Sequence, residues 1–199
     1  GNYYVSHNFK EADLDRKADP FNFSTKTISY IGAVGYLESN IKFIDAIANL
    51  EGWSLKYIGH GTQDRNLESY VRMRGLNCVS FIGAYKAEEK SVFYKSTNFV
   101  LGCYGEDSTL VRTLLPNRLY ESCVYKRPII VNKNTYVASV VERFGIGIVC
   151  NLADFSLLGD MLDSYYDVDF YRQYCERCDE FLRLVENDVS FFKNKLVTW

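Results

Sequence analysis

The stretch ISYIGAVG, residues 28–35, decides the fold, because it is an apolar run of strand length that ends in glycine. The same pattern returns along the chain. The further runs are SLKYIG (54–59), CVSFIG (78–83), FVLGCY (99–104), PIIVN (128–132) and IGIVC (146–150). Short apolar runs bounded by glycine are typical of parallel strands that are buried on both faces of a sheet.

The segments between these runs have helical periodicity. Apolar residues at Ile41, Ile44 and Ala48, for example, share one face of a helix. Strands that alternate with helices predict an α/β fold, in which a doubly wound, mostly parallel, Rossmann-like sheet of about six strands precedes C-terminal helices. The other helical segments are residues 66–74, 87–96, 116–125, 135–144, 154–164 and 167–185.

Three parts of the chain differ in character. Residues 1–26 are polar and aperiodic, and we expect a linker between domains. Residues 27–166 form the predicted Rossmann-like domain. Residues 167–199 begin with a helical stripe and end in FFKNKLVTW, whose aromatic residues have no obvious partner in the sequence. We therefore expect this C-terminal helix to pack on a further, N-terminal domain, and Phe191, Phe192 and Trp199 to be exposed without it.

Composition narrows the class of protein. A hydrophobic content of 47% over 199 residues fits a globular core. The net charge of −2 provides no basic field for nucleic acid. No apolar run reaches the ~20 residues that span a bilayer. Cys175 and Cys178 form an isolated CxxC motif without a nearby histidine, so we expect structural thiols in a reducing, cytoplasmic protein.

Glycine follows the first four predicted strands. In open parallel sheets ligands bind at the carboxyl ends of the strands, where glycine permits close approach of the backbone. One such turn is usually structural, but the set favours a ligand of nucleotide type. The turns contain Gly32, then Gly59 and Gly61, then Gly83 with Tyr85, and Gly102 with Gly105. The fingerprints of dinucleotide and P-loop sites are absent.

The segment PNRLYES, residues 116–122, places polar residues at the start of a predicted helix. Asn117, Arg118 and Glu121 lie where this helix faces the strand ends. Arg118 and Glu121 are three residues apart and share a helix face. The simpler alternative is a solvated Arg–Glu pair on the helix surface.

Six segments occur in the order found in a known family. They are the first strand with its glycine, YIGHG, NCVSFIGAY, YKSTNFVLGCY, PNRLYESCVYKRPII and VVERFGIGIV. Over residues 28–150 the chain resembles the C-terminal, donor-binding domain of group-1 glycosyltransferases of the GT-B fold, which include many capsule and lipopolysaccharide enzymes. The opening VSHN, residues 5–8, resembles the linker that precedes that domain.

The resemblance implies a donor site. Glu121 is expected to hydrogen-bond the ribose of a nucleoside-diphosphate sugar, and Arg118 to assist with phosphate charge. Tyr85 is expected near the base. The other candidate donor-binding residues are Gly32, Gly59, Gly61, Gly83 and Asn117.

The implied activity is transfer of a sugar, with retention of configuration, to a glycan or lipid-linked acceptor in polysaccharide biosynthesis. The acceptor is expected on the missing N-terminal domain, which is also expected to place the protein at the inner membrane face. The chain alone is then expected to be inactive, and no catalytic residue is assigned to it. The nucleotide sugar is a substrate, and we expect no cofactor and no metal.

The sequence departs from the family at three places. Ala33 and the uncharged pair Ser39-Asn40 stand where the family has the Arg and Lys that clamp the diphosphate, and Thr113 stands where it has its first Glu. These departures favour an alternative, a non-catalytic subunit that binds nucleotide sugar or serves in assembly. A sugar-nucleotide epimerase of the same fold would need catalytic carboxylates and histidine, for which we find no candidates.

Two further motifs have simpler explanations. Asp167-Val168-Asp169 matches the metal-binding DxD of another glycosyltransferase fold, but here it opens a helix, where Asp is an ordinary cap. His60 follows a strand and is expected at most to line the pocket. Glu106 and Asp107 are too few ligands for a firm Mg²⁺ site.

Overall fold

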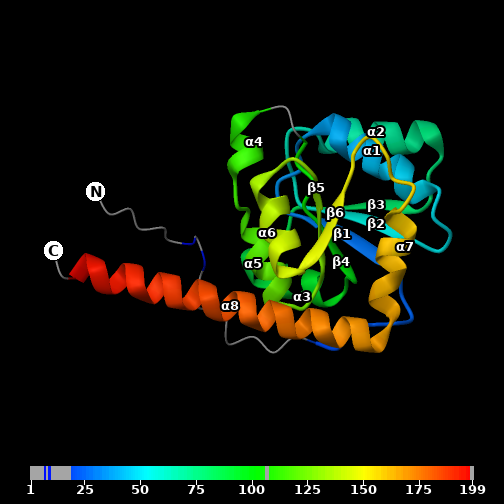
Figure 1. The fold of residues 1–199 in the computed structure, drawn as a ribbon. Coiled ribbons are helices and arrows are strands. Elements are labelled where there is room, and N and C mark those ends of the chain that lie inside the picture. The colour runs from blue at the N-terminus through cyan, green and yellow to red at the C-terminus, as the bar shows by residue number, and fades with distance from the viewer. Residues whose placement is uncertain (1–6, 8, 10–18, 106–107, 198–199) are drawn as a thin grey trace.

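The structure is a computed structural model that describes residues 7, 9, 19–105 and 108–197. A central sheet carries helices on both faces (Figure 1). Its six strands are all parallel and lie in the order β3-β2-β1-β4-β5-β6. The predicted doubly wound α/β fold is confirmed. The strands are β1 (Thr27–Ile31), β2 (Ser54–Ile58), β3 (Val79–Gly83), β4 (Phe99–Leu101), β5 (Ile129–Asn132) and β6 (Gly147–Cys150).

The handedness of the crossovers determines which face of the sheet each helix covers. Parallel strands are joined by right-handed crossovers, so connections that run in opposite directions along the sheet lie on opposite faces. The first face carries α1 (Leu37–Ala48) and α2 (Asp64–Arg74). The second face carries the helices between β3 and β6, namely η2 (Ala87–Glu89), α3 (Lys90–Lys95), α4 (Thr109–Thr113), α5 (Asn117–Val124) and α6 (Tyr136–Phe144). The short helix α4 was not predicted from the sequence.

Burial of the strands matches their composition. Every residue of β1, β4 and β5 is buried, as expected for central strands that are covered on both faces. Strand β3 lies at an edge, and two of its residues are exposed. Each large apolar side chain buried in this core contributes about 1.5–3 kcal/mol.

A long C-terminal helix packs on the helices of the second face. After α7 (Leu158–Asp163) and η3 (Ser164–Tyr166), helix α8 (Val168–Val197) packs against α5 and α6. The Asp167 carboxylate accepts a 2.8 Å hydrogen bond from the Phe170 N–H, so the DxD motif is a helix cap as predicted. The buried stripe of α8 consists of Tyr174, Cys178, Phe181, Leu182, Val185 and Val189.

Helix α8 is longer than predicted. It continues to Val197 because residues 186–197 contain no glycine or proline to end it. Its last turns extend beyond the sheet (Figure 1). Phe191 is 52% exposed there, while Phe192 is partly buried. Trp199 lies outside the described residues, as does most of the predicted linker.

The cysteines carry no disulfide. All six are free thiols. Cys103 and Cys150 lie close together, with their sulfur atoms 3.6 Å apart, and both are buried in the core. Within the described ranges, no helix combines the length and the apolar composition needed to cross a membrane.

Candidate functional site

The order of the strands creates a crevice between β1 and β4. The connections from these two neighbours leave in opposite directions, and ligands of open α/β sheets bind at the carboxyl side of such a switch point. Gly32 follows β1 with a φ of 126°. Its N–H donates to the Ile58 carbonyl at 2.8 Å, and the Gly59 N–H donates to the Gly83 carbonyl at 2.8 Å. The glycine turns therefore continue the sheet beyond its strands.

Two of the glycines are required by this packing. A side chain on Gly59 would place its first carbon 2.2 Å from the Gly32 carbonyl oxygen. One on Gly61 would place it 2.0 Å from the Val34 carbonyl oxygen. Real Cβ atoms do not approach backbone so closely, so close contact between the turns is sufficient to explain these glycines. Their predicted role in lining a donor pocket stays a prediction.

Arg118 spans the switch point from α5. Its Nε donates to the Ile31 carbonyl at 2.5 Å and its Nη1 to the Leu101 carbonyl at 3.2 Å, which ties the ends of β1 and β4 together. The guanidinium lies over the Tyr30 ring, 3.8 Å from its centre, and the residue is 7% exposed. The alternative of a solvated Arg118–Glu121 pair is wrong, because both side chains are buried and each bonds to other groups.

Glu121 lies in the same crevice but turns toward α3. Its Oε1 accepts from the Lys90 ammonium at 2.6 Å and its Oε2 from the Tyr94 hydroxyl at 2.7 Å. Burial, together with the nearby Glu121 charge, raises the pKa of Tyr94 well above its usual value. A neutral phenol therefore donates to the carboxylate. Lys90 and Tyr94 are four residues apart on α3, so both face Glu121.

Tyr85 joins this group from the segment after β3. Its ring contacts Phe93 edge-on, with the ring centres 5.4 Å apart. Burial raises the pKa of the Tyr85 phenol. Asn117, by contrast, is exposed at the first turn of α5.

Comparison with solved structures identifies this architecture, whereas no protein-family model and no curated protein matches the sequence. The C-terminal domain of the group-1 glycosyl transferase LpcC from Francisella tularensis superposes with a TM-score of 0.60 and 17% identity, over 91% of this chain and 94% of that one. The chain has the fold of a GT-B glycosyltransferase half.

Two longer proteins share the GT-B domain. Anabaena HepE, solved in complex with UDP, has a TM-score of 0.69 and 14% identity over 88% of this chain. A TarM mutant from S. aureus, solved with fondaparinux, α-GlcNAc-glycerol and UDP, has a TM-score of 0.73 and 13% identity over 96% of it. The chain spans 49% of HepE and 38% of TarM, so it corresponds to about half or less of these proteins.

His60 lies in the turn after β2, and its side chain is largely exposed. Its side chain is 67% exposed, and its Nδ1 lies 2.8 Å from the Asp64 carboxylate in the first turn of α2. This hydrogen bond lowers the pKa of Asp64. Within the described residues no three His, Cys, Asp or Glu side chains converge to hold a metal. Glu106 and Asp107 lie outside those residues.

The positions that depart from the family have local roles. Ala33 is exposed, and its carbonyl accepts a 2.8 Å hydrogen bond from the Tyr30 hydroxyl. The Asn40 amide donates to the Gly35 carbonyl at 2.7 Å and so fixes the start of α1. The Thr113 hydroxyl donates back to the Thr109 carbonyl at 2.9 Å within α4. None of the three supplies positive charge to the crevice.

Lys90 and Tyr94 are the residues of the site that the sequence analysis missed. Both come from the segment 87–96, which was predicted only as a helix. A signal was present in the spacing, because Lys90 and Tyr94 form a polar i, i+4 pair at the helix that precedes the fourth strand. Which polar group they meet depends on how α3 packs beside α5.

Proposed function

We propose that this chain is the donor-binding half of a glycosyltransferase, which holds a nucleoside-diphosphate sugar while a further domain binds the acceptor. The observation that carries the proposal is the buried Glu121 carboxylate at the switch-point crevice, positioned by Lys90 and Tyr94, with Tyr85 packed on Phe93 of the same helix α3. The shared fold supports it, since HepE has been solved with UDP and with UDP-glucose.

The chemistry of the crevice suits a ribose. Each oxygen of Glu121 accepts one hydrogen bond in the free protein and has a second lone pair for a ribose hydroxyl. The Lys90 ammonium donates to Glu121 and so holds the carboxylate in position. Tyr85 provides an aromatic surface for the base. We propose that Arg118 acts indirectly, by fixing the ends of β1 and β4 under the diphosphate.

The transfer itself needs the acceptor domain. In the proposed reaction the bond between the sugar C1 and the diphosphate oxygen breaks, and C1 forms a bond to an acceptor hydroxyl with retention of configuration. The hydroxyl proton passes to a base outside this chain. We propose a glycan or lipid-linked acceptor and a role in polysaccharide biosynthesis, and we expect no transfer by this chain alone and no requirement for metal.

Calorimetric titration with UDP tests the proposal. Glu121→Gln replaces one acceptor oxygen with a donor, so we expect UDP to bind about tenfold more weakly or worse. Glu68→Gln, on the exposed face of α2, is the matched control and is expected to leave affinity unchanged. A chelator is expected to have no effect. Absence of UDP binding to the wild-type chain, or equal affinity of Glu121→Gln, would refute the donor site.

A second function is favoured by one observation. The departing positions put no cation in the crevice, and Arg118 is committed to backbone carbonyls, so the leaving diphosphate lacks the expected clamp. A subunit that binds nucleotide sugar without transferring it needs no such clamp. The full-length protein distinguishes the two, because a catalyst hydrolyses or transfers a bound sugar donor and a binding subunit leaves it intact.

A further inference from the structure

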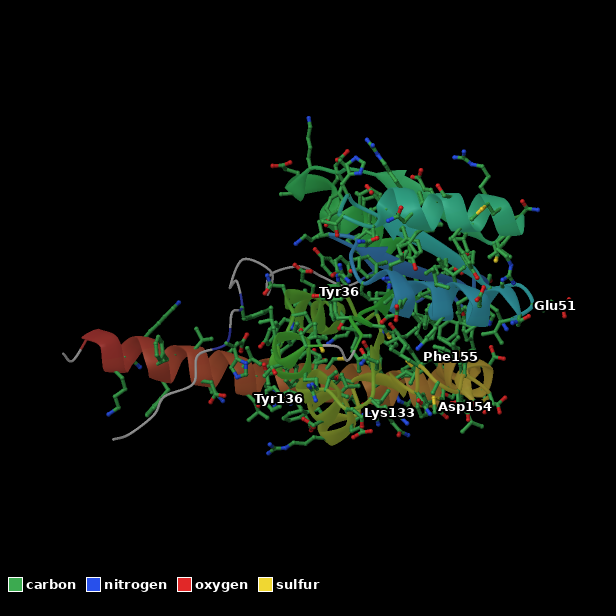
Figure 2. All side chains as sticks on the ribbon, turned by 90° about the horizontal axis from the view of Figure 1, so that it is seen from above. Tyr36, Glu51, Lys133, Tyr136, Asp154 and Phe155 are labelled. Carbon is green, nitrogen blue, oxygen red and sulfur yellow. The ribbon has the colours of Figure 1, made fainter. Side chains whose placement is uncertain are left out.

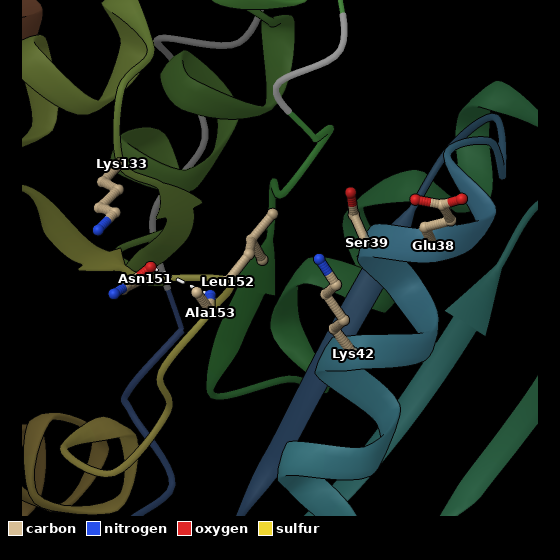
Figure 3. Close-up of a pocket in the computed structure, with 7 residues that line it drawn as sticks. All are labelled: Glu38, Ser39, Lys42, Lys133, Asn151, Leu152 and Ala153. Atoms are coloured by element: carbon tan, nitrogen blue, oxygen red, sulfur yellow. Dashed lines mark hydrogen bonds between the residues drawn. The ribbon is translucent and has the colours of Figure 1, made fainter.

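A separate cavity lies at the same edge of the sheet, on the side of β5 and β6 (Figure 3). It has a volume of about 220 Å³ and opens between the first turns of α1 and the segments that follow β5 and β6. It shares no residue with the crevice around Arg118 and Glu121. The lining residues are Glu38, Ser39, Lys42, Lys133, Asn151, Leu152 and Ala153.

Two lysines approach this cavity from different elements. Lys42 comes from α1 and Lys133 from the end of β5, and Figure 3 shows them on opposite sides. Neither forms a salt bridge within the described part of the chain, whereas Lys26, Lys90 and Lys126 each pair with a carboxylate. The Lys133 backbone is held in place, because its N–H donates to the Cys150 carbonyl at 2.8 Å.

The polar groups of the lining are mainly donors. Ser39 is 6% exposed and lines the cavity, yet its hydroxyl has no hydrogen-bond partner among the described residues. The Asn151 side-chain oxygen accepts from the Ala153 N–H at 3.0 Å, which leaves the amide N–H groups available. The Ser39 hydroxyl is therefore available to donate to a ligand in the cavity.

The first turn of α1 adds a partial positive charge. This helix has 12 residues, and Tyr36 at its N-cap has a φ of 57° and provides no side-chain acceptor. The N–H groups of an uncapped first turn favour an anion. Ser39 is the third residue of this helix and lies within that first turn.

Two carboxylates limit the positive charge. Glu38 is the one acidic residue of the lining, and its carboxylate points away from both lysines in Figure 3. Asp154 lies near Lys133 (Figure 2), outside the lining. Hydrogen bonds from Ser156 are the main cause of the lowered pKa of the Asp154 carboxyl. The positive charge of Lys133 lowers this pKa further. The lining therefore retains two cations against one carboxylate.

We propose that this cavity binds an oxyanion, a phosphate or carboxylate group, between Lys42 and Lys133 with the Ser39 hydroxyl as a further donor. Binding of an oxyanion in this cavity does not depend on the proposed function. The role of that oxyanion in sugar transfer rests on the proposed function. The oxyanion belongs either to the donor diphosphate, whose clamp is missing at Ala33 and Ser39-Asn40, or to a charged group of the acceptor.

Inorganic phosphate is the probe. We expect its addition to shift the backbone amide NMR signals of Ser39 and Ala153 in a saturable way. The double variant Lys42→Met, Lys133→Met is expected to weaken this binding at least about tenfold. Lys193→Met, an exposed lysine on the distal part of α8, is the control and is expected to change nothing.

A second titration, with the protein saturated by UDP, separates the two sources. Loss of the phosphate response in the presence of UDP assigns the site to the donor diphosphate, and persistence assigns it to a second anionic group. Either result supports an oxyanion site. No saturable shift at Ser39 and Ala153, or an unchanged response in the double variant, would overturn it. The first titration contains no nucleotide, so its outcome is independent of whether UDP binds.

Discussion

Two regions of the sheet's carboxyl edge, its centre and the side of β5 and β6, are built differently. At the crevice between β1 and β4 the charged groups are buried and already paired, Arg118 with two backbone carbonyls and Glu121 with Lys90 and Tyr94. At the cavity beside β5 and β6 the lysines are exposed and form no salt bridge with described residues.

The difference separates two ways of preparing a binding site. A buried, satisfied network is rigid before the ligand arrives, and its residues contribute to folding as well as to binding. An open group of like charges contributes little to folding and becomes useful only when an anion neutralises it. Substitutions at the crevice are therefore expected to change both stability and affinity, and substitutions at the cavity affinity alone.

The largest effect is expected for Arg118→Met. This change removes the donors to the Ile31 and Leu101 carbonyls, which stay buried, and also the cation–π contact with Tyr30. We expect a loss of about 2–4 kcal/mol in the free energy of unfolding, measured by urea denaturation. The exposed Arg112→Met provides the control. A loss below that of the control would show that Arg118 is not structural and would return it to phosphate binding.

A double-mutant cycle tests the pair at the other side of the crevice. Glu121→Gln and Lys90→Met are each expected to cost about 1–3 kcal/mol of stability, because each leaves the other member of a largely buried pair without its charge partner. Together they are expected to cost less than the sum of the two. Strict additivity would mean that the 2.6 Å contact is not energetically coupled, and the crevice would no longer differ from the cavity in this respect.

Alkaline pH tests the burial of Tyr104, whose ring lies 5.2 Å from the Arg118 guanidinium. Burial raises the pKa of Tyr104 to about 12. The unfolded value is about 10, so the neutral phenol contributes stability that is fully present below pH ~10 and is lost as pH rises toward the folded pKa. We expect about 1 kcal/mol to be lost by about pH 11. Tyr104→Phe should show a shallower loss, and identical profiles for the two proteins would contradict this.

The fold was predictable because its signals are local. A strand run such as residues 28–34 and its terminal glycine lie together in the sequence, and the structure places β1 there. The end of α8 was predicted too early. The apolar stripe read from the sequence ended at Val185, but no glycine or proline follows to interrupt the backbone, and the helix continues to Val197.

The sequence predicted several residues of the site but not the groups that their side chains contact. Spacing identified Arg118 and Glu121 and implied a shared face, yet the structure turns one toward the strand ends and the other toward α3. Lys90 meets Glu121 across 31 positions of sequence, so the contact depends on how two helices pack. No local pattern encodes that arrangement. The cavity lysines were missed for the same reason, because Lys42 and Lys133 come from separate elements.

The smallest effect on stability is expected for the two lysines of the cavity, in contrast with the residues of the crevice. Lys42→Met and Lys133→Met remove exposed charges that form no salt bridge with described residues, so each is expected to change the free energy of unfolding by less than about 0.5 kcal/mol. The pair lies across one cavity, where like charges repel, so the double variant is expected to be as stable as the wild type or slightly more so. Urea denaturation at low and high salt measures this, since salt screens the repulsion and should remove any gain. A loss comparable with that of Arg118→Met would show that these lysines stabilise the fold, and the contrast between a paired central crevice and an open cavity would fail.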